Sequence, residues 1–201
     1  MITAGAGDSV HLRGLTIAGL GSGSSGILFT TGGNLAIENC VIRNFRFAGI
    51  FIAPTTSSSF SVSNTIASNN FGGGILVAAA TGVLSKVKTN NNFQGGILIT
   101  KASAVTVVDS EASNNNTHFG AGIQAVGSGT AVMVRNSVAS YNNAGLSVLL
   151  NAILRVAHSV VTGNDTGVNT SLAGTIQSYG DNDIDGNAND NTGVLTKIPM
   201  H

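Results

Sequence analysis

The chain is poor in charge. Only 9% of its 201 residues are charged, and nine Lys and Arg balance nine Asp and Glu. An average soluble domain carries about 25% charged residues, so this composition is unusual. Binding to nucleic acids or anionic membranes needs clustered Lys and Arg, whereas the cationic residues here are scattered along the chain. The sequence therefore predicts no nucleic-acid partner.

Cysteine and long apolar runs are also scarce. Cys40 is the single cysteine, so no disulfide can form within the chain and thiols give no indication of the compartment. No apolar run approaches the roughly 18 residues of a membrane span. The first ten residues lack the charged-then-apolar pattern of a secretion signal. We expect no membrane span, and the localisation stays open.

Glycine and asparagine are abundant instead. The chain has 27 glycines and 22 asparagines but only two prolines. Both abundant residues accept left-handed backbone conformations at little cost. A chain with so many of them, and with short apolar runs between them, must turn often.

A dipeptide of glycine and an aliphatic residue recurs at regular intervals. Successive glycines lie 22 to 26 residues apart. The eight pairs are Gly26-Ile27, Gly49-Ile50, Gly74-Ile75, Gly96-Ile97, Gly122-Ile123, Gly145-Leu146, Gly167-Val168 and Gly193-Val194. A fixed period of this length is typical of solenoids, in which each repeat stacks on the next.

Segments between these pairs, such as 35–44 and 60–69, alternate apolar and polar residues and then break at Asn or Ser. A period of two is typical of β-strands, and the abundant Gly, Asn, Ser and Thr argue against helices. Sandwiches and barrels also contain many short strands, but they need no fixed period. We therefore predict an all-β, right-handed parallel β-helix of about eight coils with three short strands per coil. It would form one domain, 1–201, with 176–201 as a polar C-terminal coil or cap.

Stacked coils would align equivalent residues in columns about 4.8 Å apart. Two interior apolar columns are expected, one of Ile27, Ile50, Ile75, Ile97 and Ile123, the other of Leu35, Phe60, Val105, Val132 and Leu154. Cys40 would belong to a column of small packed residues with Thr65, Ser110, Ser137 and Ser159.

Four segments carry a resemblance to a known group: HLRGLTI (11–17), GNLAIENCVIRN (33–44), VSNTIASNN (62–70) and SYGDNDIDGN (178–187). The sequence resembles the bacterial right-handed parallel β-helix repeat proteins of the pectin-lyase-like superfamily. The resemblance implies the fold and not one activity, because members include polysaccharide lyases, hydrolases, epimerases and proteins with no assigned reaction. Relatives are often exported, and they usually have further coils before the segment that resembles 13–17.

One polar column follows the strand-breaking position. It holds Asn39, Asn64, Lys86, Asp109, Asn136 and His158. The favoured interpretation is a solvated surface with an asparagine ladder and two cross-coil ion pairs, Lys86–Asp109 and Lys88–Glu111.

The alternative is a catalytic groove in which Lys86, Asp109, Arg135 and His158 converge. A lyase needs positive side chains and a base, and a hydrolase needs two carboxylates, for which Asp109 and Glu111 are the only mid-chain pair. The Asp-Asp pair, the Gly-His-Gly motif and the calcium-binding aspartates that the resemblance implies for family enzymes are absent.

Metal ligands are few. Asp181, Asp183 and Asp185 match the first half of an EF-hand loop, but Thr192 stands where the loop needs a bidentate glutamate. We expect these side chains to close turns, with calcium binding as the alternative, and no other cofactor. His11, His118 and His201 lack ligand spacing.

Phe71, Phe93 and Phe119 each lie three residues before a repeated glycine. A stacked aromatic column is expected to pack internally. The alternative is a solvent-facing ligand-binding platform for sugar rings or a partner chain, although the chain has no Trp and only two Tyr.

The sequence thus favours a non-catalytic β-helix scaffold that binds glycan or protein partners. The alternative is a polysaccharide-active enzyme, a lyase or hydrolase of the same superfamily. Self-association is also expected, through the N-terminal coil end, because residues 1–10 lack the polar character of a cap whereas residues 180–191 have it.

Overall fold

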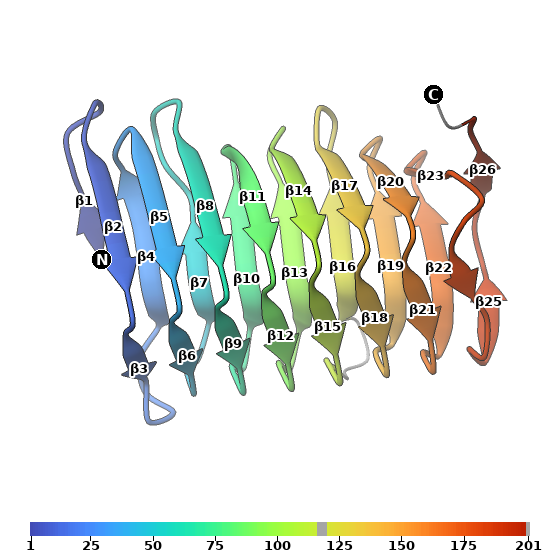
Figure 1. Cartoon of the computed structure of the whole chain (residues 1–201), viewed down its shortest axis with the longest axis horizontal. Coiled ribbons are helices and arrows are strands. Elements are labelled where there is room, and N and C mark those ends of the chain that lie inside the picture. Colours follow the sequence, from blue (N-terminus) through green and yellow to red (C-terminus); the bar gives the residue numbers. More distant parts are fainter. Residues whose placement is uncertain (116–119, 200–201) are drawn as a thin grey trace.

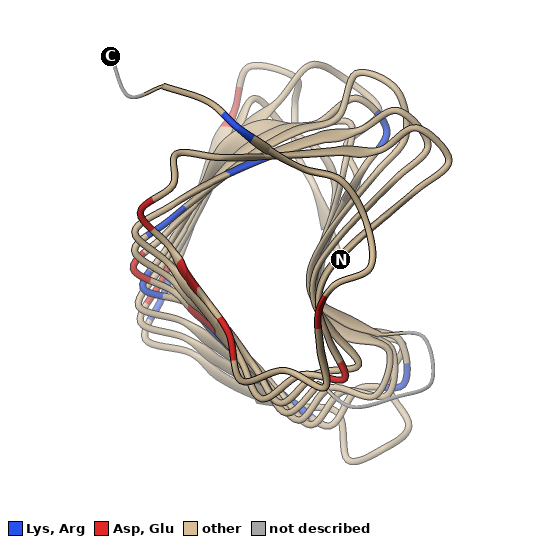
Figure 2. Ribbon diagram, turned by 90° about the vertical axis from the view of Figure 1, so that its right-hand side faces the viewer, with Lys and Arg blue, Asp and Glu red and all other residues tan. Residues whose placement is uncertain are grey.

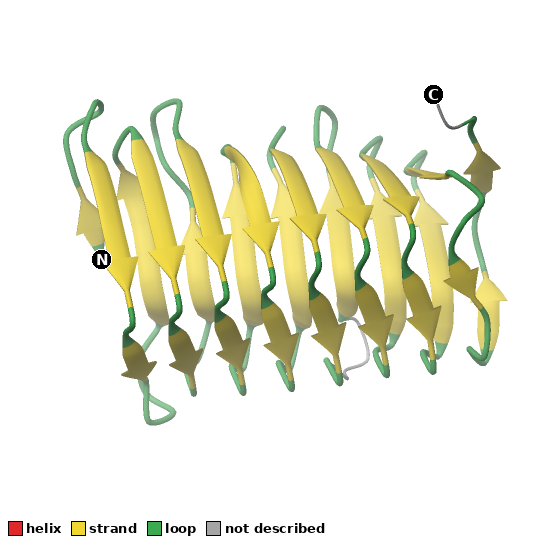
Figure 3. Ribbon diagram, viewed as in Figure 1, coloured by secondary structure: helices red, strands yellow, loops and turns green. Residues whose placement is uncertain are grey.

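The computed structural model describes residues 1–115 and 120–199, and it is a parallel β-solenoid built from three sheets (Figure 1). Each coil contributes one strand to each sheet in turn, which we call sheets A, B and C. The described residues form strands and turns and contain no helix (Figure 3). None of them is therefore part of a helix long and apolar enough to cross a membrane.

Sheet A has nine strands: β1 (Ile2–Thr3), β4 (Ser25–Thr31), β7 (Ala48–Ile52), β10 (Gly73–Ala78), β13 (Gly95–Thr100), β16 (Ala121–Val126), β19 (Ala144–Leu149), β22 (Thr166–Ser171) and β25 (Asn189–Asn191). Sheet B also has nine: β2 (Ser9–Arg13), β5 (Asn34–Glu38), β8 (Ser59–Ser63), β11 (Thr81–Ser85), β14 (Ala104–Val108), β17 (Ala131–Arg135), β20 (Ile153–Ala157), β23 (Thr175–Ser178) and β26 (Leu195–Lys197). Sheet C has eight: β3 (Thr16–Ala18), β6 (Val41–Arg43), β9 (Ile66–Ser68), β12 (Lys88–Asn90), β15 (Glu111–Ser113), β18 (Val138–Ser140), β21 (Val160–Thr162) and β24 (Asp183–Ile184).

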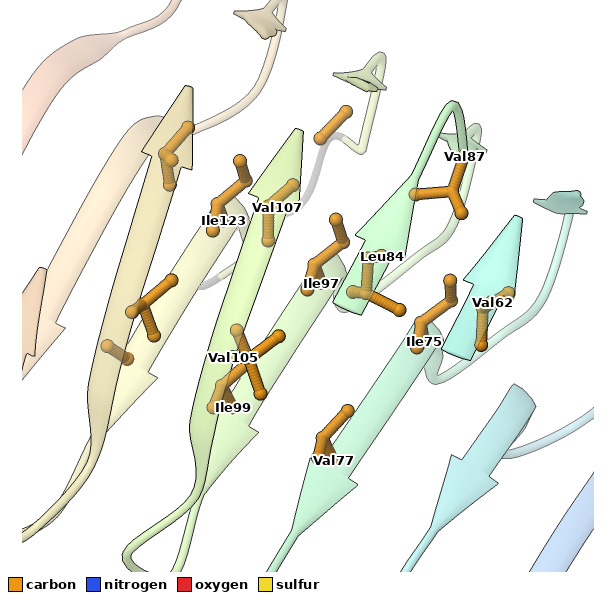
Figure 4. Close-up of a cluster of buried hydrophobic side chains, with 14 of the residues drawn as sticks. Val62, Ile75, Val77, Leu84, Val87, Ile97, Ile99, Val105, Val107 and Ile123 are labelled. Carbon is orange, nitrogen blue, oxygen red and sulfur yellow. The ribbon is translucent and has the colours of Figure 1, made fainter. Parts of the chain in front are cut away.

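The strand register confirms the expected apolar columns. In sheet A, Ile27, Ile50, Ile75, Ile97, Ile123, Leu146 and Val168 pair coil to coil. In sheet B, the column from Leu35 to Leu154 continues to Ile176 and includes Gly82 between Phe60 and Val105. Figure 4 shows side chains of both sheets meeting in the interior.

The eighth glycine–aliphatic pair does not follow the register. Val168 pairs with Asn191 and not with Val194, which is 67% exposed. The last coil returns to sheet A after 23 residues, and Gly193 therefore comes after the paired position. Sequence spacing alone cannot give the register of a coil whose turns have changed length.

All three corners contain left-handed residues, and two of them repeat a single left-handed position from coil to coil. Between sheets B and C the turning residues are Gly14, Asn39, Asn64, Lys86, Asp109, Asn136 and His158, all with φ between 47° and 68°. Between sheets C and A they are Asn44, Asn69, Asn91, Asn114, Tyr141, Gly163 and Gly186. Asn and Gly predominate because they accept this conformation most easily. The left-handed Asn and Gly residues therefore mark the corners, whereas the first seven glycines of the glycine–aliphatic repeat lie within strands of sheet A.

A second asparagine column lies directly after the C-to-A corner, and the sequence analysis did not identify it. Its members are Asn70, Asn92, Asn115, Asn142, Asn164 and Asn187. From Asn70 to Asn164, each Nδ2 donates to Oδ1 of the next asparagine over 2.8–3.1 Å. Asn39, Asn64 and Asn136, expected to form an asparagine ladder on a solvated surface, are exposed corner residues, and Asn136 binds Asp109 and not another asparagine.

Cys40 is buried, as its column predicted. The Oγ atoms of Thr65, Ser110, Ser137 and Ser159 each accept a hydrogen bond from a backbone N–H of the preceding coil. Val87 interrupts the hydroxyl groups between Thr65 and Ser110. Hydrogen bonds to small hydroxyl side chains therefore join successive coils along the inside of this corner.

Candidate functional site

The candidate residues gather on two corners of the solenoid. Viewed along the long axis, most charged residues cluster at the corner between sheets B and C, at the left of Figure 2. We call this the charged ridge and define it by Lys86, Lys88, Asp109, Glu111, Asn136 and His158. The other location is the corner between sheets C and A.

Lys88 and Glu111 form the ion pair expected from the sequence. They are register partners on β12 and β15, and Lys88 Nζ lies 3.3 Å from Glu111 Oε2. Glu111 Oε1 accepts hydrogen bonds from Ser113 Oγ over 2.6 Å and from Asn90 Nδ2 over 3.3 Å. Both carboxylate oxygens therefore have partners from adjacent coils or from the same strand.

These contacts hold the pKa of Glu111 below its ordinary value. The hydrogen bond from Ser113 is the main cause, partial burial opposes it, and Lys88 and Asn90 lower the pKa further. A general acid of a hydrolase needs the opposite, a carboxyl group that keeps its proton near neutral pH. Glu111 is thus suited to holding two coils together and unsuited to donating a proton.

The second expected ion pair is not formed. Lys86 and Asp109 occupy equivalent corner positions in successive coils, but Asp109 Oδ1 instead accepts a hydrogen bond from Asn136 Nδ2 over 2.6 Å. The described ion pairs join Arg13 to Glu38, Lys88 to Glu111 and His158 to Asp181. The prediction was wrong because the Asp109 carboxylate accepts a hydrogen bond from Asn136, the equivalent corner residue of the following coil, and does not contact Lys86 of the preceding coil within ion-pair distance.

Lys86, Asp109, Glu111 and Asn136 nevertheless line one shallow pocket of about 360 Å³. Arg135 and His158 do not line it. Arg135 is the exposed last residue of β17. Of the four residues of the proposed catalytic groove, only Lys86 and Asp109 therefore share a pocket.

His158 contacts a different partner, Asp181 of the last coil. Its ring Nδ1 lies 2.5 Å from Asp181 Oδ2, and its backbone N–H donates to Asp181 Oδ1 over 3.1 Å. The ring contact lacks hydrogen-bond geometry, and Oδ2 is buried without another donor. Asp181 is largely buried, so it fastens the last coil to the body of the solenoid.

The acidic segment does not form an EF-hand loop. Asp181 contacts His158, Asp183 begins β24, and Asp185 is exposed in the turn before Gly186. Within the described ranges, no three Asp, Glu, His or Cys side chains come together as metal ligands would. Each aspartate instead occupies its own position in the last coil.

Phe71 and Phe93 do not pack internally, which overturns the favoured interpretation. Their side chains are 57% and 51% exposed, and the rings stack with centroids 4.6 Å apart and planes 7° from parallel. The register places Arg46 in the same row, one coil before Phe71. The sequence could not show that this row lies just outside the buried asparagine column and therefore faces solvent. Phe119, like His118 and His201, lies outside the described residues.

An open pocket of about 660 Å³ lies beside the two rings. Leu20 and Gly21 bound it on the side of the first coil, in the long turn between β3 and β4 at the lower left of Figure 1. Asn44, Phe45, Arg46, Asn69, Asn70, Phe71, Asn91 and Phe93 complete the lining. We call this pocket and its lining residues the Phe corner.

The columns, corners and strand order agree with the comparison to known protein families. Residues 5–189 match the family described as "Right handed beta helix region". The chain belongs to this right-handed β-helix family. The fold is also similar to the crystal structure of pectate lyase Pel9A, with a TM-score of 0.66 and 16% sequence identity over 89% of this chain.

That match covers 56% of the lyase, so the chain spans little more than half of the lyase's length. At this identity the similarity shows the fold alone. A comparison with the sequences of curated proteins gives no match.

Proposed function

We propose that this β-helix is a non-catalytic scaffold that binds glycan or protein partners on its surface. The observation that carries the proposal is the state of Glu111, whose two oxygens are engaged by Lys88, Ser113 and Asn90 and whose pKa is lowered. Asp109 is likewise hydrogen-bonded to Asn136. The mid-chain carboxylates thus join neighbouring coils, which supports a structural role for the charged ridge.

A turnover assay tests this proposal. Purified chain is incubated with polygalacturonate, alginate and xylan, and release of unsaturated or reducing ends is followed. The proposal predicts release no faster than in buffer. Release that disappears in Lys86→Ala and Asp109→Asn, and persists in a matched surface variant such as Arg155→Ala, would contradict it.

The second candidate is an enzyme that acts on an acidic polysaccharide. Two observations favour it: Lys86 and Asp109 line one pocket, and the fold is similar to that of a pectate lyase. In that case Lys86 would neutralise a substrate carboxylate or accept a proton, and Asp109 would orient it. The assay above separates the two candidates.

Self-association through the N-terminal coil end remains a proposal. Ile2, Val10, Leu12 and Ile17 of the first coil pack against the core but stay only partly buried, and unpaired strand edges can pair with another chain. Sedimentation at micromolar concentration tests it, and a single species of 20.1 kDa would contradict it.

A further inference from the structure

The Phe corner presents apolar surface that the fold does not use. Phe71 and Phe93 are exposed although other large apolar side chains of nearby coils, such as Ile50 and Ile75, are fully buried. Exposed apolar side chains gathered on one patch are typical of binding surfaces. The two rings, placed side by side by consecutive coils, therefore form a ready-made apolar platform.

The two rings lie between Arg46 and the following coil in one row of the solenoid. Phe93 belongs to the following coil, and the 4.6 Å between the ring centroids matches the coil spacing of about 4.8 Å. The rings therefore stack along the solenoid axis, and Phe93 covers one face of Phe71. The opposite face is directed towards the preceding coil, where Arg46 occupies the equivalent position.

Leu20 adds exposed apolar surface to the same pocket. Its side chain is 87% exposed, and its backbone is left-handed with a φ of 50°. A left-handed conformation is unfavourable for a residue with a Cβ atom. Leucine is not favoured in such a turn, and at this position its side chain does not pack in the core. It does line the same pocket as Phe71.

The polar part of the lining suits hydroxyl groups. Asn44, Asn69 and Asn91 occupy equivalent left-handed corner positions in three consecutive coils and line the pocket. An amide side chain both donates and accepts hydrogen bonds, as a hydroxyl group does. Arg46 adds a planar group that only donates, and none of the lining residues carries a carboxylate.

We propose that the Phe corner binds a glycan, with the apolar face of a pyranose ring packed against the exposed surface of the Phe71–Phe93 pair. A pyranose has C–H groups on its faces and hydroxyl groups around its edge, which matches an aromatic wall surrounded by amides. Leu20 closes the opposite side of the ring. Arg46 binds a hydroxyl of a neutral sugar or the carboxylate of a uronic acid. This inference rests on the proposed binding function and assigns its site and ligand class.

Titration calorimetry with cellohexaose, a neutral probe, and hexagalacturonate, an anionic one, tests the site. We expect at least one probe to bind, and Phe71→Ala to weaken that binding by about tenfold or more, the size typical of a central aromatic contact. Phe71→Tyr should retain it, and Leu20→Ala should weaken it. Leu172→Ala is the matched control, because Leu172 is also left-handed and 66% exposed but lies in the turn between β22 and β23.

Arg46→Ala distinguishes an acidic glycan from a neutral one. A selective loss of hexagalacturonate binding supports a uronic-acid glycan, and equal effects on both probes support a neutral one. Binding of neither probe, binding that Phe71→Ala leaves unchanged, or capture of an aromatic peptide at this corner in place of both probes would overturn the inference. Cleavage of either probe would instead contradict the non-catalytic proposal, and the Phe71 variants would still decide the site.

Discussion

Gly74 packs directly against the buried amide of Asn92. A Cβ atom on Gly74 would lie 2.9 Å from Asn92 Nδ2, closer than such contacts occur in real proteins. The amide cannot move away, because Nδ2 donates to the backbone oxygen of Ala67 and to Asn115 Oδ1, both over 3.0 Å. Gly49, Gly122, Gly145 and Gly167 have the same relationship to the asparagine of a neighbouring coil. The asparagine column and the backbone of the neighbouring coil therefore leave no room for a side chain at these repeated glycines.

Gly74→Ala should destabilise the fold. Over-packing of a tight interior site typically costs about 1–3 kcal/mol, and we expect a decrease in the free energy of unfolding within this range. Urea denaturation followed by circular dichroism measures it. Gly7→Ala is the control, because a Cβ atom there meets nothing within 4 Å. Equal stability of the two variants would mean that the glycine column is not needed for packing.

Asn142→Ala should cost at least about 2 kcal/mol, since it leaves several buried groups without partners. Asn142 Oδ1 accepts from the backbone and side-chain N–H groups of Asn115, and Nδ2 donates to Asn164 Oδ1. The adjacent Asn143 reaches only Asp165 at the surface. Asn143→Ala should therefore have little effect in the same denaturation experiment. A similar decrease in the free energy of unfolding in both variants would mean that the buried asparagine column does not stabilise the fold more than a surface asparagine does.

Glu111 should make stability depend on pH. Because its pKa is lowered in the folded state, its contribution is complete above the ordinary pKa of 4.5 and is lost as the pH falls through the lowered value. Thermal unfolding temperatures measured from neutral pH downwards should fall more steeply in the unmodified chain than in Glu111→Gln. Parallel pH profiles of the two proteins would contradict this assignment.

Asp181→Ala should loosen the last coil without unfolding the rest. Asp181 binds both the ring and the backbone N–H of His158, and the last coil contains few fully buried residues. Local opening is governed by such contacts. Hydrogen exchange read by mass spectrometry should become faster in residues 179–197 and stay unchanged in β13 and β16. Asp185→Ala, at an exposed turn, should change neither region.

The sequence predicted most of the solenoid because two signals repeat in every coil. Glycine before an aliphatic residue marks the approach to sheet A, and alternation marks sheet B. The buried asparagine column also has a signal, since Asn70 and Asn92 both lie four residues before a repeated glycine. That signal was overlooked because the exposed asparagines at 69 and 91 immediately precede them.

The candidate sites were less predictable because they depend on which way a corner side chain points. Phe45 and Phe71 are one row apart, yet Phe45 is buried at the start of the asparagine column, where its backbone N–H binds Asn70, and Phe71 is exposed. Sequence spacing aligned Lys86 with Asp109 correctly. It could not show that the carboxylate of Asp109 would accept a hydrogen bond from Asn136. At a corner, two adjacent residues can point into the core and into solvent. The period of the sequence repeat does not show which of the two is buried.

One NMR experiment tests the account most directly. Isotope-labelled chain is mixed with cellohexaose and, separately, with hexagalacturonate, and the amide signals of the protein and the signals of the sugar are followed in the same sample over a day. The account predicts that shifts concentrate in residues 20–21, 44–46, 69–71 and 91–93 while the sugar stays intact. New sugar signals from cleavage, or shifts concentrated at the charged ridge around Lys86 and Asp109, would contradict it.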